Sequence, residues 1–399
     1  MSGAVDKPAE VPHRIPITSI VAYFLRLGSL GFGGPAALCG QMEKELVGEK
    51  AWVTKDEMRE AIAISQSMPG PLAIQVGIFI AHMRGGVWGA WAGGWAFILP
   101  NFIIVSALGA LYVYLGGFTW MTAIFYGVAP AVIALIAHSC WRLAKLGVDD
   151  KMQWAIAAVA FAITVAVEAE VALLFIAAGI FGIFWYGTIF RRPSAEALAL
   201  FIMPAKAAGI AGPAAASASL PGLLWFFLKA GSLTFGSGLV IVPFLEKGLV
   251  QETGWLNPRE FLIAVAIGMI SPGPVVITAT FVGFIVAGFW GAAVCTVGIF
   301  LPSFLMVLIV APILRRHRGN ANVQGFIKGT YAAAIGTILG ACVLLAKIAI
   351  GDWLTAVILV VSLGLLFRFK VNNPALVVAC AVIGVVAFPL LKPTFVFVQ

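Results

Sequence analysis

Residues 23–33 read YFLRLGSLGFG, and residues 226–236 read FFLKAGSLTFG. The two stretches lie 203 residues apart (226 − 23), and seven of their eleven positions are identical. Arg26 in the first stretch corresponds to Lys229 in the second, so a positive charge is retained as well. Self-similarity of this kind within one chain indicates a duplicated unit.

The same register continues far beyond these stretches. At the offset of 203, Pro69-Gly70-Pro71 corresponds to Pro272-Gly273-Pro274. After a one-residue deletion the offset is 202 (290 − 88), and Leu99-Pro100 then corresponds to Leu301-Pro302. Chance does not preserve one register from residue 23 to residue 145, so we interpret the chain as two homologous halves.

The composition places both halves in a lipid bilayer. Hydrophobic residues make up 61% of the chain and charged residues 11%, and the mean hydropathy is +1.03. Soluble domains carry about 25% charged residues. Apolar runs recur at the length of about 20 residues that crosses a bilayer core. The sequence therefore predicts an all-α polytopic membrane protein.

Four regions follow from the repeat. Residues 1–14, which mix charges with Pro and Gly, are expected to be a disordered tail. Residues 15–192 and 220–399 are the two transmembrane domains, and residues 193–219 form an Ala-, Pro- and Ser-rich linker that could hold an extra span. Because the first apolar run lacks a following A-x-A site, we expect no cleaved signal peptide.

Each half predicts the same order of helices. A first helix ends in a Gly-rich break, a charged amphipathic connection follows, and the next helix is interrupted by the Pro-Gly-Pro before four further apolar helices. The predicted ranges are 17–36, 39–56 and 57–83 in the first half, and 220–242, 244–258 and 260–286 in the second.

Positive charges between the apolar runs indicate the orientation. The net charge of +8 arises largely from short clusters of Lys and Arg, as in cytoplasmic loops, and not from a basic surface for nucleic acid. Both halves place these clusters in the cytoplasm only if the second half is inverted relative to the first. We therefore expect inverted repeats with 10 to 13 spans. The clusters are Arg142/Lys145/Lys151, Arg191/Arg192, Arg315/Arg316/Arg318 and Arg368/Lys370.

The paired Pro-Gly-Pro motifs are the main candidates for a substrate site. Proline inside a helix removes a hydrogen bond and breaks it, and broken backbone at membrane depth persists only within protein or beside a wet cavity. Half-helices beginning at Pro71 and Pro274 would direct free N–H groups at an anion; two structural kinks are the alternative. The predicted binding residues here are Ser67, Pro69, Gly70, Pro71, Ser271, Pro272, Gly273 and Pro274.

Two further features lie at the first helix of each half. Glycine lets backbone approach a ligand closely, although small residues also serve helix packing. Arg26 and Lys229 are cations within a span, where a charge is costly; they could neutralise a doubly charged anion, or extend to the interface. The glycines predicted to contact the substrate are Gly31, Gly33, Gly34 and Gly236.

Carboxylates near the interrupted helices are candidates for proton coupling. Glu57, Glu60 and Glu260 stand there, with solvated loop residues as the alternative interpretation. The sequence has no Walker A, HExxH, nucleophile-elbow or Rossmann motif, so we expect neither an enzyme nor a bound cofactor. Its five cysteines are scattered singly without zinc spacing, so we expect no metal site.

At FLRLGSLGFGGP, WVTKDE and SQSMPGP, and at their second-half counterparts, the sequence resembles the chromate ion transporter superfamily. It is similar in particular to the long, two-domain bacterial members, over nearly the whole chain from Ile17. The resemblance implies export of chromate from the cytoplasm across the bacterial inner membrane, and resistance to it. Gly236-Ser237-Gly238 departs from Gly33-Gly34-Pro35, so we expect the first half to contribute more to the site.

Taken together, we expect a secondary transporter that exports chromate, driven by membrane potential either alone or together with proton exchange. The residues themselves indicate a transporter for an anion, whereas chromate comes from the resemblance. Chromate is a tetrahedral dianion nearly isosteric with sulfate, so a sulfate or related oxyanion carrier or exchanger is the alternative, and a passive anion channel is another. The expected partners are the oxyanion and the lipid bilayer, and a homodimer remains an open alternative.

Overall fold

The computed structural model describes residues 14–31, 34–66, 68–114, 119–167, 172–187, 219–234, 241–317, 320–369, 371 and 373–391. Apart from Arg14 and Ser219, the predicted tail (1–14) and linker (193–219) lie outside the described residues. The described residues form helices and no strand, which confirms the prediction of an all-α protein.

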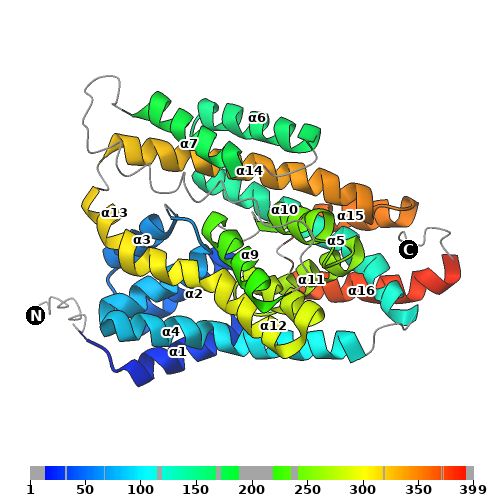
Figure 1. Ribbon diagram of the computed structural model, residues 1–399, viewed down its shortest axis with the longest axis horizontal. Coiled ribbons are helices and arrows are strands. Elements are labelled where there is room, and N and C mark those ends of the chain that lie inside the picture. Colours follow the sequence, from blue (N-terminus) through cyan, green and yellow to red (C-terminus); the bar gives the residue numbers. More distant parts are fainter. Residues whose placement is uncertain are drawn as a thin grey trace, which may run out of the picture.

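The two halves repeat the same helices in the same order (Figure 1). The first half contains α1 (Ile17–Leu30), α2 (Gly34–Met42), the π-helix η1 (Glu43–Glu49), α3 (Lys55–Gln66), α4 (Leu72–Tyr114), α5 (Thr119–Gly147), α6 (Lys151–Val167) and α7 (Ala172–Tyr186). The second half contains α9 (Leu220–Leu233), α10 (Ile241–Glu246), the π-helix η2 (Lys247–Glu252), α11 (Pro258–Ile270), the 3₁₀-helix η3 (Val275–Ile277), α12 (Thr278–Leu305), the π-helix η4 (Met306–Val310), α13 (Ala311–His317), α14 (Ala321–Ala349), α15 (Trp353–Arg368) and α16 (Asn373–Leu391).

Local sequence explains where the interrupted helices begin. Before α11, the Asn257 side chain accepts from the Glu260 N–H while Glu260 accepts from the Asn257 N–H, which is a capping box. Thr54 and Glu57 make the same reciprocal pair at the start of α3, at 3.1 and 2.8 Å. These contacts satisfy N–H groups that a helix start would otherwise leave free.

The long helices α4 and α12 are each a helical hairpin with a tight glycine turn. Gly86 (φ 63°, ψ −158°) interrupts α4, and Gly288 (φ 61°, ψ −154°) interrupts α12. The chain folds back so closely that a Cβ on Gly89 would lie 2.5 Å from the carbonyl oxygen of Ala81. Only glycine adopts these dihedral angles at low cost, so equivalent glycines fix both turns.

The first helix of each half packs on the hairpin of that half, α1 on α4 and α9 on α12. A Cβ on Gly28 would lie 2.3 Å from the carbonyl oxygen of Phe97, and one on Gly231 would lie 2.4 Å from that of Ile299. Small residues therefore bring the backbones together, as is common between membrane helices. The two hairpins also pack against each other.

The later helices of each half pack against helices of the other half. α14 of the second half packs against α6 and α7 of the first, while α5 of the first half packs against α15 and α16 of the second (Figure 1). A Cβ on Gly127 would lie 1.9 Å from the carbonyl oxygen of Cys380, and one on Gly329 would lie 2.0 Å from that of Ala178. Such reciprocal contacts are the signature of a two-fold relation.

Equivalent helices run in opposite directions. In Figure 1, α4 ends at the right of the molecule, whereas α12 leads into α13 at the left. This antiparallel relation is the arrangement of inverted repeats that the distribution of Lys and Arg predicted.

Within the described residues, four segments are long and apolar enough to cross a membrane: Leu72–Tyr114, Tyr126–Lys145, Val275–Leu314 and Ala321–Lys347. Shorter apolar helices accompany them: Ile17–Leu30, Lys151–Ala166, Leu174–Tyr186, Leu220–Leu233, Trp353–Arg368 and Ala375–Phe388. The protein is therefore a multi-pass membrane protein, and the total of 10 to 13 spans stays a prediction.

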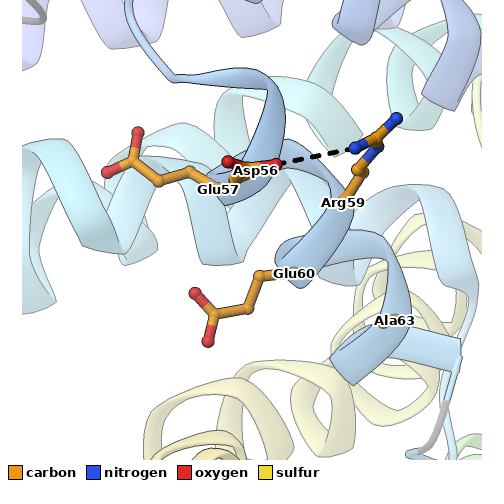
Figure 2. Close-up of a pocket in the computed structure, with 5 residues that line it drawn as sticks. All are labelled: Asp56, Glu57, Arg59, Glu60 and Ala63. Carbon is orange, nitrogen blue, oxygen red and sulfur yellow. Dashed lines mark ion pairs between the residues drawn. The ribbon is translucent and has the colours of Figure 1, made fainter.

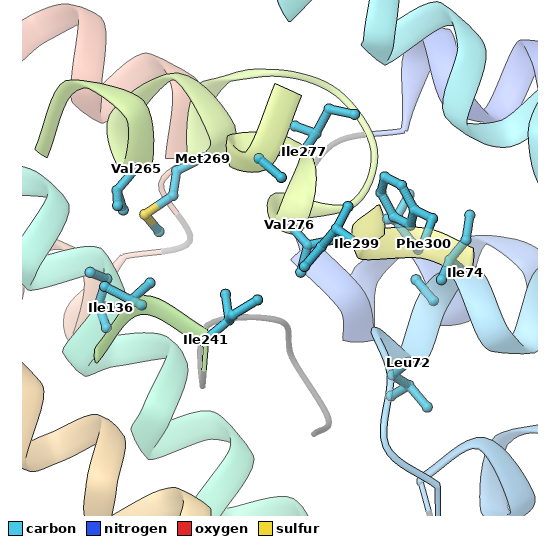
Figure 3. Packing of buried hydrophobic residues seen from close by; sticks show 14 of the residues in the cluster. Leu72, Ile74, Ile136, Ile241, Val265, Met269, Val276, Ile277, Ile299 and Phe300 are labelled. Atoms are coloured by element: carbon cyan, nitrogen blue, oxygen red, sulfur yellow. The ribbon is translucent and has the colours of Figure 1, made fainter. Parts of the chain in front are cut away.

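Apolar side chains of both halves form one continuous core around the interrupted helices (Figure 3). Since the exchanged helices contribute to this core as well, neither half buries its apolar surface alone. The residues labelled there are Leu72, Ile74, Ile136, Ile241, Val265, Met269, Val276, Ile277, Ile299 and Phe300.

Candidate functional site: two crossed Pro-Gly-Pro breaks

The first Pro-Gly-Pro separates α3 from α4. Gly70 has φ 136°, a value that only glycine adopts without strain, and its N–H donates to the carbonyl oxygen of Thr234, the residue that ends α9. The carbonyl oxygen of Pro71 accepts from the N–H of Gln75 at 3.1 Å and so begins α4. The chain is therefore broken into two half-helices here, as predicted.

The second Pro-Gly-Pro repeats this geometry with the halves exchanged. Gly273 has φ 87°, and its N–H donates to the carbonyl oxygen of Gly31 at the end of α1, at 2.7 Å. Gly31 and Thr234 are equivalent positions at the offset of 203. Each break is thus hydrogen-bonded to the end of the first helix of the other half, and we call the pair the crossed breaks.

Polar side chains lie directly beside the crossed breaks. A Cβ on Gly70 would come within 2.9 Å of Ser303 Oγ, and a Cβ on Gly273 within 3.1 Å of Asn101 Nδ2. Asn101 and Ser303 are equivalent residues, at the offset of 202, on the second arms of α4 and α12. Gln75 Nε2 donates to the carbonyl oxygen of Pro69 at 2.6 Å. Side chains from both halves therefore surround each break.

These polar side chains are fully buried and incompletely hydrogen-bonded. Asn101, Ser303 and Gln75 are each 0% exposed. Within the described residues, both polar atoms of the Asn101 amide, Ser303 Oγ and Gln75 Oε1 lack a hydrogen-bond partner, and so does Ser65 Oγ at the end of α3. Buried polar groups of proteins are nearly always paired, so this cluster has the character of a site prepared for a polar ligand.

The chemistry of the cluster suits an oxyanion. The amide of Asn101 and the hydroxyl of Ser303 can donate hydrogen bonds, and the first N–H groups of α4 have no acceptor within that helix. A helix start also carries partial positive charge. The second break differs slightly, since the 3₁₀-helix η3 stands between Pro274 and α12.

The sequence missed Asn101, Ser303 and Gln75 as site residues. A signal was present: both halves carry a Leu-Pro followed by a polar residue within an apolar span, at Leu99-Pro100-Asn101 and Leu301-Pro302-Ser303. Only the fold shows that these residues cross to the break of the other half.

Several predicted residues surround the breaks in other ways. Pro272, Gly273 and Pro274 are buried, and Ser271 Oγ donates to the carbonyl oxygen of Gly268 at 3.2 Å. Gly34 begins α2. Gly33, Ser67 and Gly236 lie outside the described residues.

The two predicted intramembrane cations have different surroundings. Arg26 forms an ion pair with Glu45 of η1, whose other oxygen accepts from Gln41 at 3.0 Å. The Arg26 guanidinium also lies 5.7 Å from the centre of the Tyr23 ring. Glu45 is only 11% exposed, so the positive charge of Arg26 is largely balanced within the first half.

Lys229, the equivalent of Arg26, has no corresponding carboxylate to pair with among the described residues. Gly248 stands at the position equivalent to Glu45, and Phe226 stands at that of Tyr23. Within the described part of the chain, Lys229 makes no hydrogen bond or ion pair. The second half therefore contributes a net positive charge where the first half is neutral.

Two of the three carboxylates predicted for proton coupling, Glu57 and Glu60 of α3, line a cavity of about 510 Å³ (Figure 2). Arg59 pairs with Asp56 at 3.6 Å. Glu260, the second-half candidate, completes the capping box with Asn257 at the start of α11.

Arg84 ties the turn of the α4 hairpin to the start of α3. Its Nη2 lies 2.5 Å from Glu57 Oε2, and its Nε donates to the carbonyl oxygen of Trp52 at 2.5 Å. Burial opposes ionisation of Glu57, but the hydrogen bonds from Arg84 and Thr54 prevail and lower the pKa of its carboxyl. The second half has Val286 and Ala287 in the corresponding region, so this clamp is specific to the first half.

Inverted repeats with discontinuous helices that cross around buried polar side chains are an architecture typical of membrane transporters. A family model described as chromate transporter matches this chain twice, over residues 18–183 and 222–385. The chain therefore belongs to the chromate transporter family, and the two matches agree with two homologous halves.

Full-length relatives support this membership. A chromate transport protein of Cupriavidus metallidurans is 45% identical over 387 residues, which cover 94% of each chain. A probable chromate transport protein of Synechococcus elongatus is 40% identical and covers 96% of this chain and 98% of its own. A chromate transport protein of Pseudomonas aeruginosa is 32% identical over 97% of both chains. No solved structure matches the chain.

Replacing Glu57 by glutamine tests the clamp. Glutamine still completes a capping box but leaves the buried Arg84 without a counter-charge, so we expect the free energy of unfolding at pH 7 to fall by about 1–3 kcal/mol. Because folding lowers the pKa of Glu57, the stabilisation is complete above the unfolded value of about 4.3 and is lost as the pH falls through the folded value. Thermal unfolding in detergent against pH measures both effects.

The matched control is Glu260→Gln, which occupies the equivalent capping box in the half where Val286 and Ala287 stand in the region of Arg84. It should leave the thermal midpoint almost unchanged. Equal destabilisation by Glu57→Gln and Glu260→Gln would show that the Arg84 clamp contributes nothing beyond the cap.

Proposed function

We propose that this protein exports chromate from the cytoplasm by alternating access around the crossed breaks. The observation that carries the proposal is the fully buried, unpaired polar cluster at those breaks, which matches the needs of a desolvated oxyanion. Membership of the chromate transporter family and the names of the full-length relatives support chromate as the ion.

Binding is best explained by neutral hydrogen-bond donors. The candidate donors are the N–H groups at the start of α4, the Ser303 hydroxyl beside Gly70 and the Asn101 amide beside Gly273, and both glycines let these side chains lie close to the broken backbone. A tetrahedral dianion presents oxygens in several directions and can be approached from both halves at once. Sulfate has the same shape and charge, so a sulfate or related oxyanion carrier is the competing function.

Lys229 supplies the long-range counter-charge in this proposal. Its ammonium is unbalanced among the described residues, whereas Arg26 would contribute only if its pair with Glu45 opened. A charge within a span is costly and is retained where it serves function. The second half thus attracts the anion more strongly than the first, which reverses the weighting expected from sequence.

The membrane potential favours export. With the cytoplasm negative, one charge crossing 100 mV is worth about 2.3 kcal/mol, so an outgoing dianion gains roughly 4.6 kcal/mol at that potential. Glu57, Glu60 and Glu260 are the candidates for coupled proton exchange. The same direction of transport accounts for chromate resistance when the protein resides in the inner membrane of a bacterium.

Chromate accumulation in everted membrane vesicles tests the proposal, because export from the cell appears as uptake. We expect saturable uptake that an interior-positive potential accelerates and that excess sulfate inhibits only in part. Sulfate uptake without chromate uptake would transfer the function to an oxyanion carrier of the competing kind. Flux without saturation or exchange would instead indicate a passive channel.

Replacing the unpaired polar residues separates binding from folding. We expect Asn101→Leu and Ser303→Ala to raise the KM for chromate by about tenfold or more each, since a hydrogen bond to a charged group is worth about 1.5–3 kcal/mol. The same variants should match or exceed the thermal stability of the parent without chromate, because they remove unpaired buried groups.

Thr337→Ala is the control for these variants, since Thr337 is equally buried but donates to Ala333 within α14. Its KM should be unchanged. Unaltered KM values for Asn101→Leu and Ser303→Ala would place the chromate elsewhere.

The two intramembrane cations should differ in importance. We expect Lys229→Gln to raise the KM for chromate severalfold more than Arg26→Gln, because Glu45 already balances Arg26. Lys229→Arg, which keeps the charge, should restore most of the affinity. Normal transport by a folded Lys229→Gln protein would contradict the assigned counter-charge.

A further inference from the structure

One face of α3 borders open space along its whole length. Arg59 and Ala63 are exposed, and Glu60 and Ile62 are partly exposed. Ala63 lines two cavities, the one of about 510 Å³ shown in Figure 2 and a second of about 340 Å³ against α13 and α14. The second cavity is lined by Ala63, Ile64, Leu314, Val323, Gln324, Ile327 and Lys328. We call the two cavities together the α3 vestibule.

The equivalent face of α11 is closed. At the offset of 203, Arg59, Glu60, Ile62 and Ala63 correspond to Leu262, Ile263, Val265 and Ala266. These four residues are 4%, 1%, 1% and 1% exposed. α11 packs against α5 and α16, whereas cavity separates α3 from α14, the equivalent of α5. The two halves are therefore alike in sequence order and unlike in conformation.

Tyr126 shows the same asymmetry from the opposite side of the gap. Lys328 lines the α3 vestibule and is partly exposed. Its equivalent at the offset of 202, Tyr126 of α5, is only 2% exposed and donates to Asp352. Both sides of the gap are thus open in one copy and closed in the other.

The inverted arrangement places the two locations on opposite sides of the membrane. α3 and α13 lie towards the left of Figure 1, and α11 lies further right, beside α5 and α16. Each location leads along its helix to one Pro-Gly-Pro: α3 ends next to the first break, and α11 ends next to the second. The open path and the closed one therefore converge on the crossed breaks.

We infer that a second vestibule opens between α11 and α5, lined by Leu262, Ile263 and Ala266, when the α3 vestibule closes. This inference rests on the proposed transport function, since it supplies the route by which the oxyanion leaves the crossed breaks on the other side of the membrane. In an inverted-repeat carrier the two halves exchange conformations, so the closed half adopts the geometry that the open half shows now.

The two vestibules differ in chemistry. Arg59 and Glu60 line the α3 vestibule where the inferred one has Leu262 and Ile263, whereas charged residues stand at the helix start in both, Asp56 and Glu57 in α3 and Arg259 and Glu260 in α11. Apolar surfaces close readily because water is released from them. The second vestibule is therefore expected to be closed in most molecules at rest, and the α3 vestibule to be the one that is open.

Cysteine accessibility tests the inference. The five native cysteines are all buried, so the parent protein serves as a nearly unreactive background. Ala63→Cys and Ala266→Cys are introduced singly and exposed to a membrane-impermeant maleimide, in right-side-out and in everted vesicles. We expect Ala63→Cys to react rapidly from one side, and Ala266→Cys to react only from the opposite side. A minor conformer at 0.1–10% population makes the second reaction about 10- to 1,000-fold slower.

The matched control is Ala264→Cys, on the other face of α11. Ala264 and its equivalent Ala61 are both 0% exposed, so this position is closed in both conformations of the exchange. It should stay unreactive from both sides. Equal reaction of Ala264→Cys and Ala266→Cys would indicate local unfolding of α11 and overturn the inference.

The labelling distinguishes this inference from the proposed function. If Ala266→Cys reacts from the opposite side while the vesicles carry no chromate, the second vestibule stands and the substrate is wrong. If chromate is transported and Ala266→Cys never reacts from that side, even during turnover, the second vestibule is wrong.

Discussion

A backbone N–H that leaves its helix inside a membrane must find an acceptor within the protein, because lipid offers none. The two Pro-Gly-Pro sequences break their helices at matching points. At each break the glycine N–H donates a hydrogen bond to a carbonyl oxygen of the other half: Gly70 to Thr234, and Gly273 to Gly31. Those two carbonyls are themselves the ends of helices, where acceptors are free. Four incomplete helix ends thereby satisfy one another in pairs.

This crossing makes the two halves a single mechanical unit. The helices that follow are exchanged in the same sense, α5 onto α15 and α16, and α14 onto α6 and α7. Glycines at the crossing points bring the backbones into contact, so substitutions there have no space to relax. A movement that separates α3 from α14 would therefore also displace the other half, because the two halves share packed helices and are not independent domains joined by a hinge.

The sequence was sufficient for the parts of the fold that depend on local rules. Duplication, the interrupted helices and the inverted orientation follow from repeated motifs, proline chemistry and the placement of Lys and Arg. The sequence could not reveal contacts that depend on which half meets which. Asn101 and Ser303 are ordinary polar residues in the sequence, and only the crossing places each beside the glycine of the opposite half. Similarly, only the hairpin turn of α4 brings Arg84 to Glu57. The pairing of Arg26 with Glu45 depends equally on how η1 packs against α1.

Divergence after duplication makes the two halves of the scaffold unequal in charge. The first half kept Glu45 beside its cation and Arg84 beside Glu57, while the second half carries Gly248 and the apolar pair Val286 and Ala287 in the corresponding places. Among the described residues, the cation of the first helix is therefore paired in the first half, at Arg26, and not in the second, at Lys229. In the proposed mechanism, a site made mainly of neutral donors with a single ammonium would bind a dianion strongly enough to desolvate it and weakly enough to release it. The second copy therefore differs from the first in electrostatics through one carboxylate and one arginine that only the first copy has.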